Sequence, residues 1–287
     1  WYTEILPEMI SLPGSMNENG KGDDISVRTK WTGKIADSSW FVSEKYARYR
    51  SEGNIKIPFW LQPDKHYVGA AWYQKELEIP ANWDGKYIEL NLERPHWETQ
   101  VWVDNQKISM QNSLASAHIY NLTDKLKPGK HLLSIRIDNR IKEINPGINS
   151  HSLTDHTQTN WNGIVGEIAL KARPLVIIKD IKTYPDIDNN EVIVKVSIIN
   201  YTGKKQDCRI VLKAKTLGDH PDESLPEVSQ KIEVENEMEK IEFVYPMGDS
   251  PLLWDEFNPN LYSMNLNLRS SGGIDQEQVT FGMREFR

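Results

Sequence analysis

Runs in which hydrophobic and polar residues alternate dominate the first half of the chain. Residues 71–79, 87–93 and 131–138 follow this pattern, and the turn signal Pro128-Gly129 stands just before the third run. Successive side chains of a β-strand point to opposite faces, so such alternation predicts strands that bury one face. The hydrophobic sides of the second and third runs are Ile88, Leu90, Leu92, Leu133, Ile135 and Ile137.

A second set of alternating runs begins after Pro174. In residues 192–199 every second side chain is Val or Ile, and shorter runs follow at 210–212, 241–245 and 264–268. About seven short strands over roughly 110 residues match the size of an immunoglobulin-like sandwich. The hydrophobic sides of these runs are Val192, Val194, Val196, Ile198, Ile210, Leu212, Ile241, Phe243, Tyr245, Met264, Leu266 and Leu268.

Together the runs predict an all-β chain, because helical periodicity is almost absent. A length of 287 residues allows two hydrophobic cores. We therefore expect two β-sandwich domains, residues 1–175 and residues 176–287.

Three other stretches lack strand periodicity. Residues 1–35 are rich in Gly, Asn and Asp and predict a long surface loop. Residues 43–50 predict a short helix capped by Ser43. The acidic stretch 218–239 predicts a solvated loop with an edge strand.

Composition excludes several classes of function. The net charge is −7 and Lys and Arg are scattered, so we expect no nucleic-acid partner. The single cysteine, Cys208, has no disulfide partner, no Cys/His spacing resembles a zinc site, and no cofactor is expected. No apolar run reaches the length of a membrane span. Because the first residue is Trp1 rather than Met, we expect that an N-terminal segment precedes it in the gene product.

Residues 151–161 carry the side chains with the most binding chemistry. They form a polar segment that contains Trp161 and leads into an apolar strand at 164–170. A second polar segment with an aromatic residue is 62–69. Carboxylates and amides can hydrogen-bond hydroxyl groups, and an aromatic face can stack on the apolar side of a pyranose ring. Packing is the competing interpretation for Trp161, His66 and Tyr67. The candidate ligand-binding residues are Asp155, His156, Asn160, Trp161, His66 and Tyr67.

A catalytic interpretation of these residues has little support. Glu93 and Glu98 flank a short stretch, and Asp155 adjoins His156, so carboxylates are present. Carboxylates at strand ends are usually solvated surface groups, and no Ser stands in a G-x-S-x-G context. We assign no catalytic residue.

Four motifs resemble glycoside hydrolase family 2, which includes β-galactosidases, β-glucuronidases and β-mannosidases. They occur in the family's order and cover nearly the whole chain. They are Trp72-Tyr73-Gln74-Lys75 with Ile79-Pro80, residues 120–139 ending in Asn139, Trp161-Asn162-Gly163-Ile164, and residues 253–262 with Phe281-Gly282-Met283-Arg284-Glu285. Two departures are Asp104-Asn105 in place of the family's Asn-Gly turn, and Gly166 where Arg is common.

The resemblance implies a jelly-roll (galactose-binding-like) domain followed by an immunoglobulin-like domain. In the family, the Phe-Gly-x-Arg stretch leads into a (β/α)8 barrel that holds both catalytic glutamates, and this chain ends at Arg287. The chain is therefore expected to be the non-catalytic front end of a β-galactosidase-like hydrolase, inactive alone. Its expected partners are a β-glycoside and the C-terminal barrel of the same polypeptide.

The resemblance also suggests a role for one residue. In family β-galactosidases an Asp of the 151–161 segment lies at the active site, and Asp155 is the nearest match. By analogy with bacterial polysaccharide-degrading enzymes, the protein is expected to be periplasmic or secreted. Sugar identity and homo-oligomer formation are left open.

Two other classes of function remain open from the residues. A stand-alone pair of carbohydrate-binding modules would bind glycans without any barrel, and exposed coplanar aromatic rings on one sheet face would favour it. A purely structural or adhesive two-sandwich protein would bind no sugar.

Overall fold

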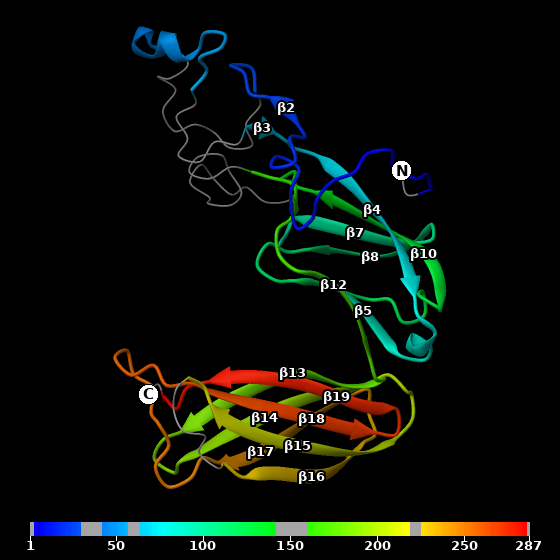
Figure 1. The fold of residues 1–287 in the computed structure, drawn as a ribbon, viewed down its shortest axis with the longest axis vertical. Coiled ribbons are helices and arrows are strands. Elements are labelled where there is room, and N and C mark those ends of the chain that lie inside the picture. Colours follow the sequence, from blue (N-terminus) through cyan, green and yellow to red (C-terminus); the bar gives the residue numbers. More distant parts are fainter. Residues whose placement is uncertain (1–2, 30–41, 57–63, 142–159, 219–224, 286–287) are drawn as a thin grey trace. The chain divides into compact units, whose positions relative to one another are not determined.

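The computed structural model describes residues 3–29, 42–56, 64–141, 160–218 and 225–285. Contacts divide the chain into two compact units (Figure 1). Unit 1 comprises Trp1–Asp84 and Ile88–Lys171, and unit 2 comprises Gly85–Tyr87 and Ala172–Arg287. The boundary expected from the sequence, between residues 175 and 176, stays a prediction.

Unit 1 is built from short strands in antiparallel sheets. Its principal sheet has the order β4-β10-β7-β8, and smaller sheets have the orders β12-β5-β9, β1-β11-β6 and β2-β3. The strands are β1 (Gly14–Ser15), β2 (Asp23–Asp24), β3 (Lys65–His66), β4 (Ala70–Ile79), β5 (Tyr87–Leu92), β6 (Pro95–His96), β7 (Glu98–Val103), β8 (Gln106–Asn112), β9 (His118–Asn121), β10 (Gly129–Asp138), β11 (Gly163–Ile164) and β12 (Ile168–Arg173). Two 3₁₀ helices are η1 (Glu44–Tyr49) and η2 (Ala81–Trp83).

The predicted hydrophobic faces form the core of unit 1. All six side chains named from the alternating runs at 87–93 and 131–138 are at most 6% exposed. Within the principal sheet, Ile135 pairs with Tyr73 on β4 and with Val101 on β7. Each fully buried aliphatic side chain contributes about 1.5–3 kcal/mol, so these faces hold the sheets together.

The two departures from the family pattern have local explanations. Asp104 and Asn105 form the two-residue turn between β7 and β8 with φ of 48° and 73°. Positive φ at both central positions is the type I′ hairpin turn, which Asp and Asn tolerate in place of Asn-Gly. Gly166 lies against Glu93, and a Cβ there would stand 2.7 Å from the Glu93 carbonyl oxygen. An Arg side chain therefore cannot replace Gly166 without moving the backbone.

The N-terminal region is less irregular than the sequence predicts. Within residues 1–35, Gly14-Ser15 pairs with β11 and Asp23-Asp24 pairs with β3, so the expectation of an uninterrupted loop is wrong at these positions. Two-residue strands are too short to produce a periodic signal. Ser43 caps a helix as predicted, since its hydroxyl accepts a hydrogen bond from Lys45 N at 3.3 Å, but the helix is 3₁₀ rather than α.

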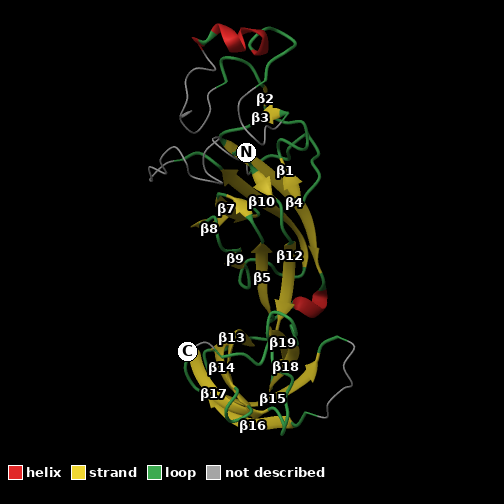
Figure 2. Cartoon of the chain, turned by 90° about the vertical axis from the view of Figure 1, so that its left-hand side faces the viewer, coloured by secondary structure: helices red, strands yellow, loops and turns green. Residues whose placement is uncertain are grey.

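Unit 2 is a sandwich of two antiparallel sheets, one facing the other across a common core (Figure 2). The sheet orders are β13-β14-β17 and β16-β15-β18-β19. The described strands are β13 (Val176–Asp186), β14 (Glu191–Asn200), β15 (Gln206–Thr216), β16 (Glu227–Val234), β17 (Met238–Pro246), β18 (Tyr262–Ser270) and β19 (Gly273–Phe281).

The core of unit 2 follows the predicted alternation closely. Of the twelve hydrophobic side chains named from the sequence, only Ile241 is half-buried, and the others are at most 4% exposed. The acidic stretch 218–239 contains the edge strand β16, as predicted.

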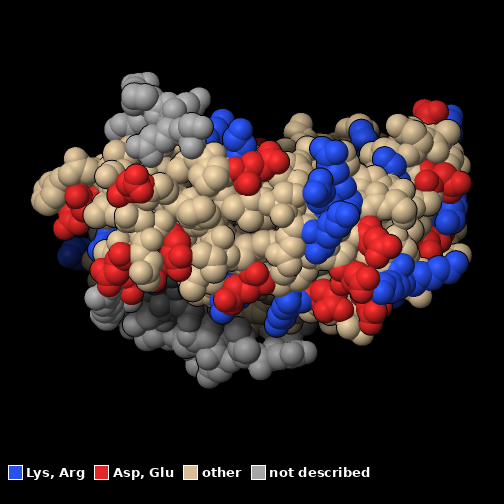
Figure 3. Space-filling model, turned by 90° about the horizontal axis from the view of Figure 1, so that it is seen from below, with Lys and Arg blue, Asp and Glu red and all other residues tan. Residues whose placement is uncertain are grey.

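The outer surface is strongly charged, and on the face shown in Figure 3 the Lys and Arg side chains gather in a band with carboxylates beside it.

A buried ion pair fixes the start of unit 2. Arg173 donates from Nε and Nη2 to the two carboxylate oxygens of Asp275, at 2.9 and 2.6 Å, and Asp275 is 3% exposed. The same carboxylate accepts a hydrogen bond from Ile178 N at 2.7 Å, and Arg173 also donates to Ile178 O. Since two-point guanidinium–carboxylate pairing is geometrically specific, it sets how β13 enters its sheet.

His131 on β10 generates a prediction about pH. Partial burial by itself lowers the pKa of His131, but hydrogen bonds to Asp104 Oδ2 and Lys127 O outweigh burial and raise the pKa above its ordinary 6.5. A raised folded pKa means that the protonated ring stabilises the fold below about pH 6.5. This contribution is lost as the pH rises through the folded pKa.

We therefore expect the melting temperature to fall by about 1–3 °C from this source between slightly acid and slightly alkaline pH. His131→Gln should remove that part of the pH dependence. Thermal denaturation of both proteins over the same pH series measures it. An unchanged profile in His131→Gln would show that the His131–Asp104 pair contributes nothing.

Candidate functional site

The amide of Asn139 is the centre of the region that holds the predicted binding segments. Asn139 is completely buried at the end of β10. Its Nδ2 donates to Tyr67 O at 2.8 Å, Trp161 O at 3.0 Å and Asn160 Oδ1 at 3.2 Å. Its Oδ1 accepts from Gly69 N at 2.8 Å, and its carbonyl accepts from Asn160 Nδ2 at 3.1 Å. One side chain thus ties together three segments that are far apart in the sequence.

Asn162 completes this network from the other side. Its Nδ2 donates to Gly69 O at 2.9 Å and to Ile137 O at 3.0 Å, and its Oδ1 accepts from the Tyr73 hydroxyl at 3.0 Å. Burial raises the pKa of Tyr73, with a smaller contribution from Tyr67, so this hydroxyl remains a donor. The chain leaving residue 159 is therefore fixed to the principal sheet by buried amides.

Trp161 is held by an aromatic contact. Its ring stacks on that of His96 with centroids 4.5 Å apart and planes at 24°. His96 Nδ1 lies 2.6 Å from Trp161 O, so Nδ1–H is the donor. Trp161 is half-buried, which leaves part of its ring open while the backbone is fixed.

The structure brings three of the predicted site residues together. Tyr67, Asn160 and Trp161 all meet at Asn139, but Asn160 is 3% exposed and its amide is committed to Asn139. The Tyr67 hydroxyl donates to Ala70 O at 3.1 Å. His66 is buried on β3, where it pairs with Asp23. Asp155 and His156 lie outside the described residues.

Sequence reasoning missed Asn139 and Asn162 as site-building residues. Both stand in the motifs on which the family resemblance rests, and an Asn that ends a strongly hydrophobic strand was the available signal. A buried amide has two donors and an acceptor that must be satisfied, so such an Asn marks a place where irregular backbone crosses a sheet.

Carboxylates near this region are engaged in ion pairs. Arg136 donates to Glu98 Oε1 at 3.0 Å and to Asp138 Oδ2 at 2.5 Å, and Arg140 also pairs with Asp138. Glu98 and Asp138 are buried. Asp138 is therefore held between two guanidinium groups, and Glu98 is bound to one.

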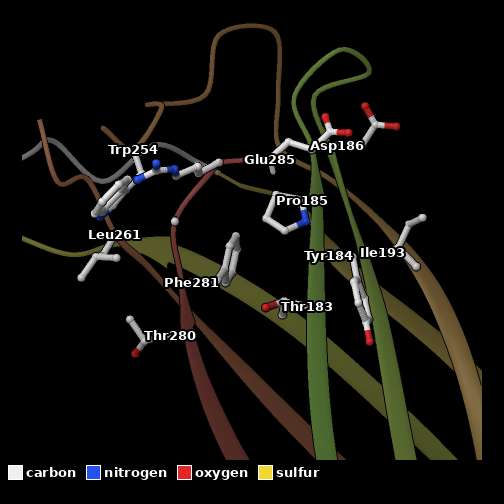
Figure 4. A pocket seen from close by; sticks show the side chains of 12 residues that line it. Thr183, Tyr184, Pro185, Asp186, Ile193, Trp254, Leu261, Thr280, Phe281 and Glu285 are labelled. Atoms are coloured by element: carbon white, nitrogen blue, oxygen red, sulfur yellow. The ribbon is translucent and has the colours of Figure 1, made fainter. Parts of the chain in front are cut away.

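A second candidate site is a pocket in unit 2, of about 810 Å³. Trp254 and Leu261 lie on one side, Tyr184 and Ile193 on the other, and Phe281 lies between them (Figure 4). The remaining lining residues are Thr183, Pro185, Asp186, Thr280, Gly282, Arg284 and Glu285.

The last motif of the family resemblance builds one wall of this pocket. The Arg284 guanidinium lies 4.5 Å from the centroid of the Trp254 ring, a cation–π contact. Gly282 passes so close to Trp254 that a Cβ would stand 2.8 Å from the ring. Backbone bridges join Leu253 to Met283 and Trp254 to Pro259. The motif therefore fixes the chain where β19 ends.

Neither a metal site nor a membrane span is found in the parts that the structure describes. No group of three or more His, Cys, Asp or Glu side chains there could hold a metal ion. None of the described helices is both long enough and apolar enough to cross a bilayer.

Comparison with known proteins identifies relatives across both units. Residues 176–284 match the sequence model of glycosyl hydrolases family 2. A Formosa agariphila protein provisionally named a β-glucuronidase is 27% identical over 79% of this chain, and a β-galactosidase of Priestia megaterium is 21% identical over 93%. The chain spans about a quarter of the length of these relatives, 26% and 25%.

Solved structures share the fold. A β-glucuronidase from glycoside hydrolase family 2 matches 97% of this chain with a TM-score of 0.70 at 16% identity, and the match covers 27% of that protein. Bacteroides uniformis β-glucuronidase 2 matches 77% of this chain with a TM-score of 0.65 at 21% identity, again over 27% of its own length. The predicted fold class, a jelly-roll sandwich followed by an immunoglobulin-like sandwich, is confirmed.

The Asn139 network yields a prediction about stability. Asn139→Ala removes the side chain that satisfies Tyr67 O, Trp161 O and Gly69 N, leaving buried polar groups without partners. We expect a loss of about 2–4 kcal/mol, measured by urea unfolding. Asn91→Ala is the matched control, since Asn91 makes one exposed hydrogen bond to Glu167 at 3.3 Å. Equal losses in both variants would contradict the role given to Asn139.

Proposed function

We propose that this chain, whose resemblance to glycoside hydrolase family 2 is confirmed, is the non-catalytic N-terminal portion of a hydrolase. The hydrolase acts on terminal β-linked sugars. The match of residues 176–284 to the family model carries this proposal. That the chain spans only about a quarter of its relatives supports a catalytic barrel elsewhere in the same polypeptide. This portion supports the barrel and contributes a segment to the substrate subsite.

The pocket of unit 2 is consistent with the supporting role. Its wall of Trp254, Gly282 and Arg284 fixes the direction of the chain where β19 ends. In the proposed full-length protein the barrel follows this point. A rigid exit from a sheet limits the orientations available to a following domain, which is what a supporting domain must provide.

The substrate-subsite role is assigned to the segment that ends at Trp161. Asp155 accepts hydrogen bonds from sugar hydroxyls, His156 adds a second polar group, and the open part of the Trp161 ring faces the sugar. Asn160 acts by positioning, because its amide is buried against Asn139. His66 and Tyr67 belong to the neighbouring segment 64–69, which the same network fixes.

The sugar is proposed at the level of class. β-Galactoside hydrolysis is the leading activity, and β-glucuronide hydrolysis is the close alternative because the relatives carry both names. We place the protein in the periplasm or outside the cell, by analogy with bacterial polysaccharide-degrading enzymes.

The carbohydrate-binding-module alternative finds less support in the jelly-roll unit. Its signature would be exposed, coplanar aromatic rings on one sheet face. The neighbouring rings of Trp72 and Trp102 on the principal sheet are tilted by 40°, and Trp102 is only 6% exposed. This pair cannot form a flat stacking platform.

Turnover separates the proposal from its alternatives. The chain alone should hydrolyse none of a panel of chromogenic β-glycosides, because it lacks the acid–nucleophile pair that the proposal assigns to the barrel. The full-length product of the reading frame should hydrolyse at least one. Turnover by the short chain, or none by the full-length product on any β-glycoside, would overturn the assignment.

Asp155 gives a second prediction within the full-length product. Asp155→Ala removes an acceptor for a sugar hydroxyl, and we expect kcat/KM to fall about 10- to 100-fold. Asp84→Ala, an exposed carboxylate beside the helix η2, is the matched control and should leave kcat/KM unchanged. Equal kinetics for both variants would remove Asp155 from the substrate subsite.

A further inference from the structure

Three cations lie side by side on the outer face of sheet β16-β15-β18-β19. Arg209 on β15 is the register partner of Lys231 on β16 and of Arg269 on β18. Side chains directly opposite on neighbouring strands have Cβ atoms about 4.5–5.5 Å apart. We call these three residues the cationic row. Like charges in this arrangement are destabilising, so the row carries a cost in the absence of an anion.

Within the described residues, no carboxylate forms an ion pair with the row, although Asp207 and Glu233 lie near it. All three side chains are exposed, and none forms an ion pair or hydrogen bond within the described residues. Asp207 and Glu233 are the next pair on the same face. They lie opposite each other, two residues along their strands from Arg209 and Lys231. Glu233 is taken by Lys205 at 2.7 Å. Three cations therefore stand against two nearby carboxylates, and the row keeps an excess of positive charge.

The row lies in a hollow and next to neutral hydrogen-bonding groups. Arg209, Lys231 and Arg269 line a depression of about 730 Å³, and Asp207 and Glu233 lie at its border. The adjacent row of the same face contains Ser229 and Asn267, both opposite Val211. A hydroxyl and an amide thus lie beside three cations.

We infer that this face binds an acidic polysaccharide, with uronate carboxylates on the cationic row and sugar hydroxyls on Ser229 and Asn267. Strands lie about 4.8 Å apart, so successive cations are spaced on the scale of one pyranose unit. Arg pairs with carboxylates through two parallel hydrogen bonds. The site is separate from the proposed substrate segment and does not depend on the hydrolase assignment.

The same observations argue against a nucleic acid. The chain carries a net charge of −7, and the row is bordered by Asp207 and Glu233. Phosphate-backbone binding draws its affinity from extended basic surfaces that neutralise many phosphates. Three cations among amides and carboxylates suit a ligand in which charges alternate with hydroxyl groups.

The test is calorimetric titration of the full chain with an oligogalacturonide, a neutral glucan of equal length and duplex DNA. The oligogalacturonide should bind, with an affinity that falls as salt is added, and the glucan should not. Arg209→Gln/Arg269→Gln should weaken binding at least about tenfold. Its melting temperature should be unchanged or higher, since like-charge repulsion is relieved.

A matched double variant controls for net charge. Lys182→Gln/Lys195→Gln also removes two cations, on β13 and β14 of the other sheet, where each is paired with a carboxylate. It should bind as the unaltered chain does. Absence of oligogalacturonide binding, an equal loss in the control, or equally tight DNA binding would each overturn the inference. Turnover by the full-length product is a separate measurement, so either proposal can fail alone.

Discussion

The buried amides of Asn139 and Asn162 are the interaction on which unit 1 depends. Irregular backbone that crosses a sheet leaves N–H and C=O groups that must find partners. These two side chains bond directly to the backbone of Tyr67, Gly69, Ile137 and Trp161. Because the sheet strands are rigid, the ends of the irregular segments are rigid as well. The described ends of these segments, at residues 67–69 and 160–162, are therefore fixed to the sheet without a helix to support them.

Unit 2 is also fixed by a small number of specific contacts. Its interior is a continuous hydrophobic core shared by two sheets. The specific polar and aromatic contacts lie where the chain enters and leaves. Arg173 and Asp275 fix the entry to β13, and Trp254 with Arg284 fixes the exit from β19. These contacts fix the backbone at both ends of the unit.

The sequence predicted the elements that depend on local pattern and missed those that depend on register. Period-two alternation identified the buried faces of both units, because core burial imposes that period on any half-buried strand. It could not identify β1, because its two residues, Gly14 and Ser15, pair with residues 163 and 164, which are far away in the sequence. Register also explains the cationic row, since Arg209, Lys231 and Arg269 are separated by many residues and only strand pairing makes them neighbours.

The ligand-binding role given to the candidate site residues stays a prediction, but the structure shows where three of them lie. Tyr67, Asn160 and Trp161 do converge, but on Asn139, which was recognised only as the last letter of a motif. Whether a polar side chain faces a ligand or the interior depends on which backbone groups lack partners nearby. That is a property of the folded chain, so the sequence alone could not show that the Asn160 amide bonds to Asn139.

The central claim is that this chain carries a substrate-subsite segment for a barrel in the same polypeptide. The most direct measurement is an experimental structure of the full-length product with a β-glycoside inhibitor bound in the barrel. The account predicts that a carboxylate oxygen of Asp155 lies within about 3 Å of a sugar hydroxyl, with Trp161 beside the ring. A bound sugar that contacts barrel residues alone, with the 151–161 segment turned away, would contradict it.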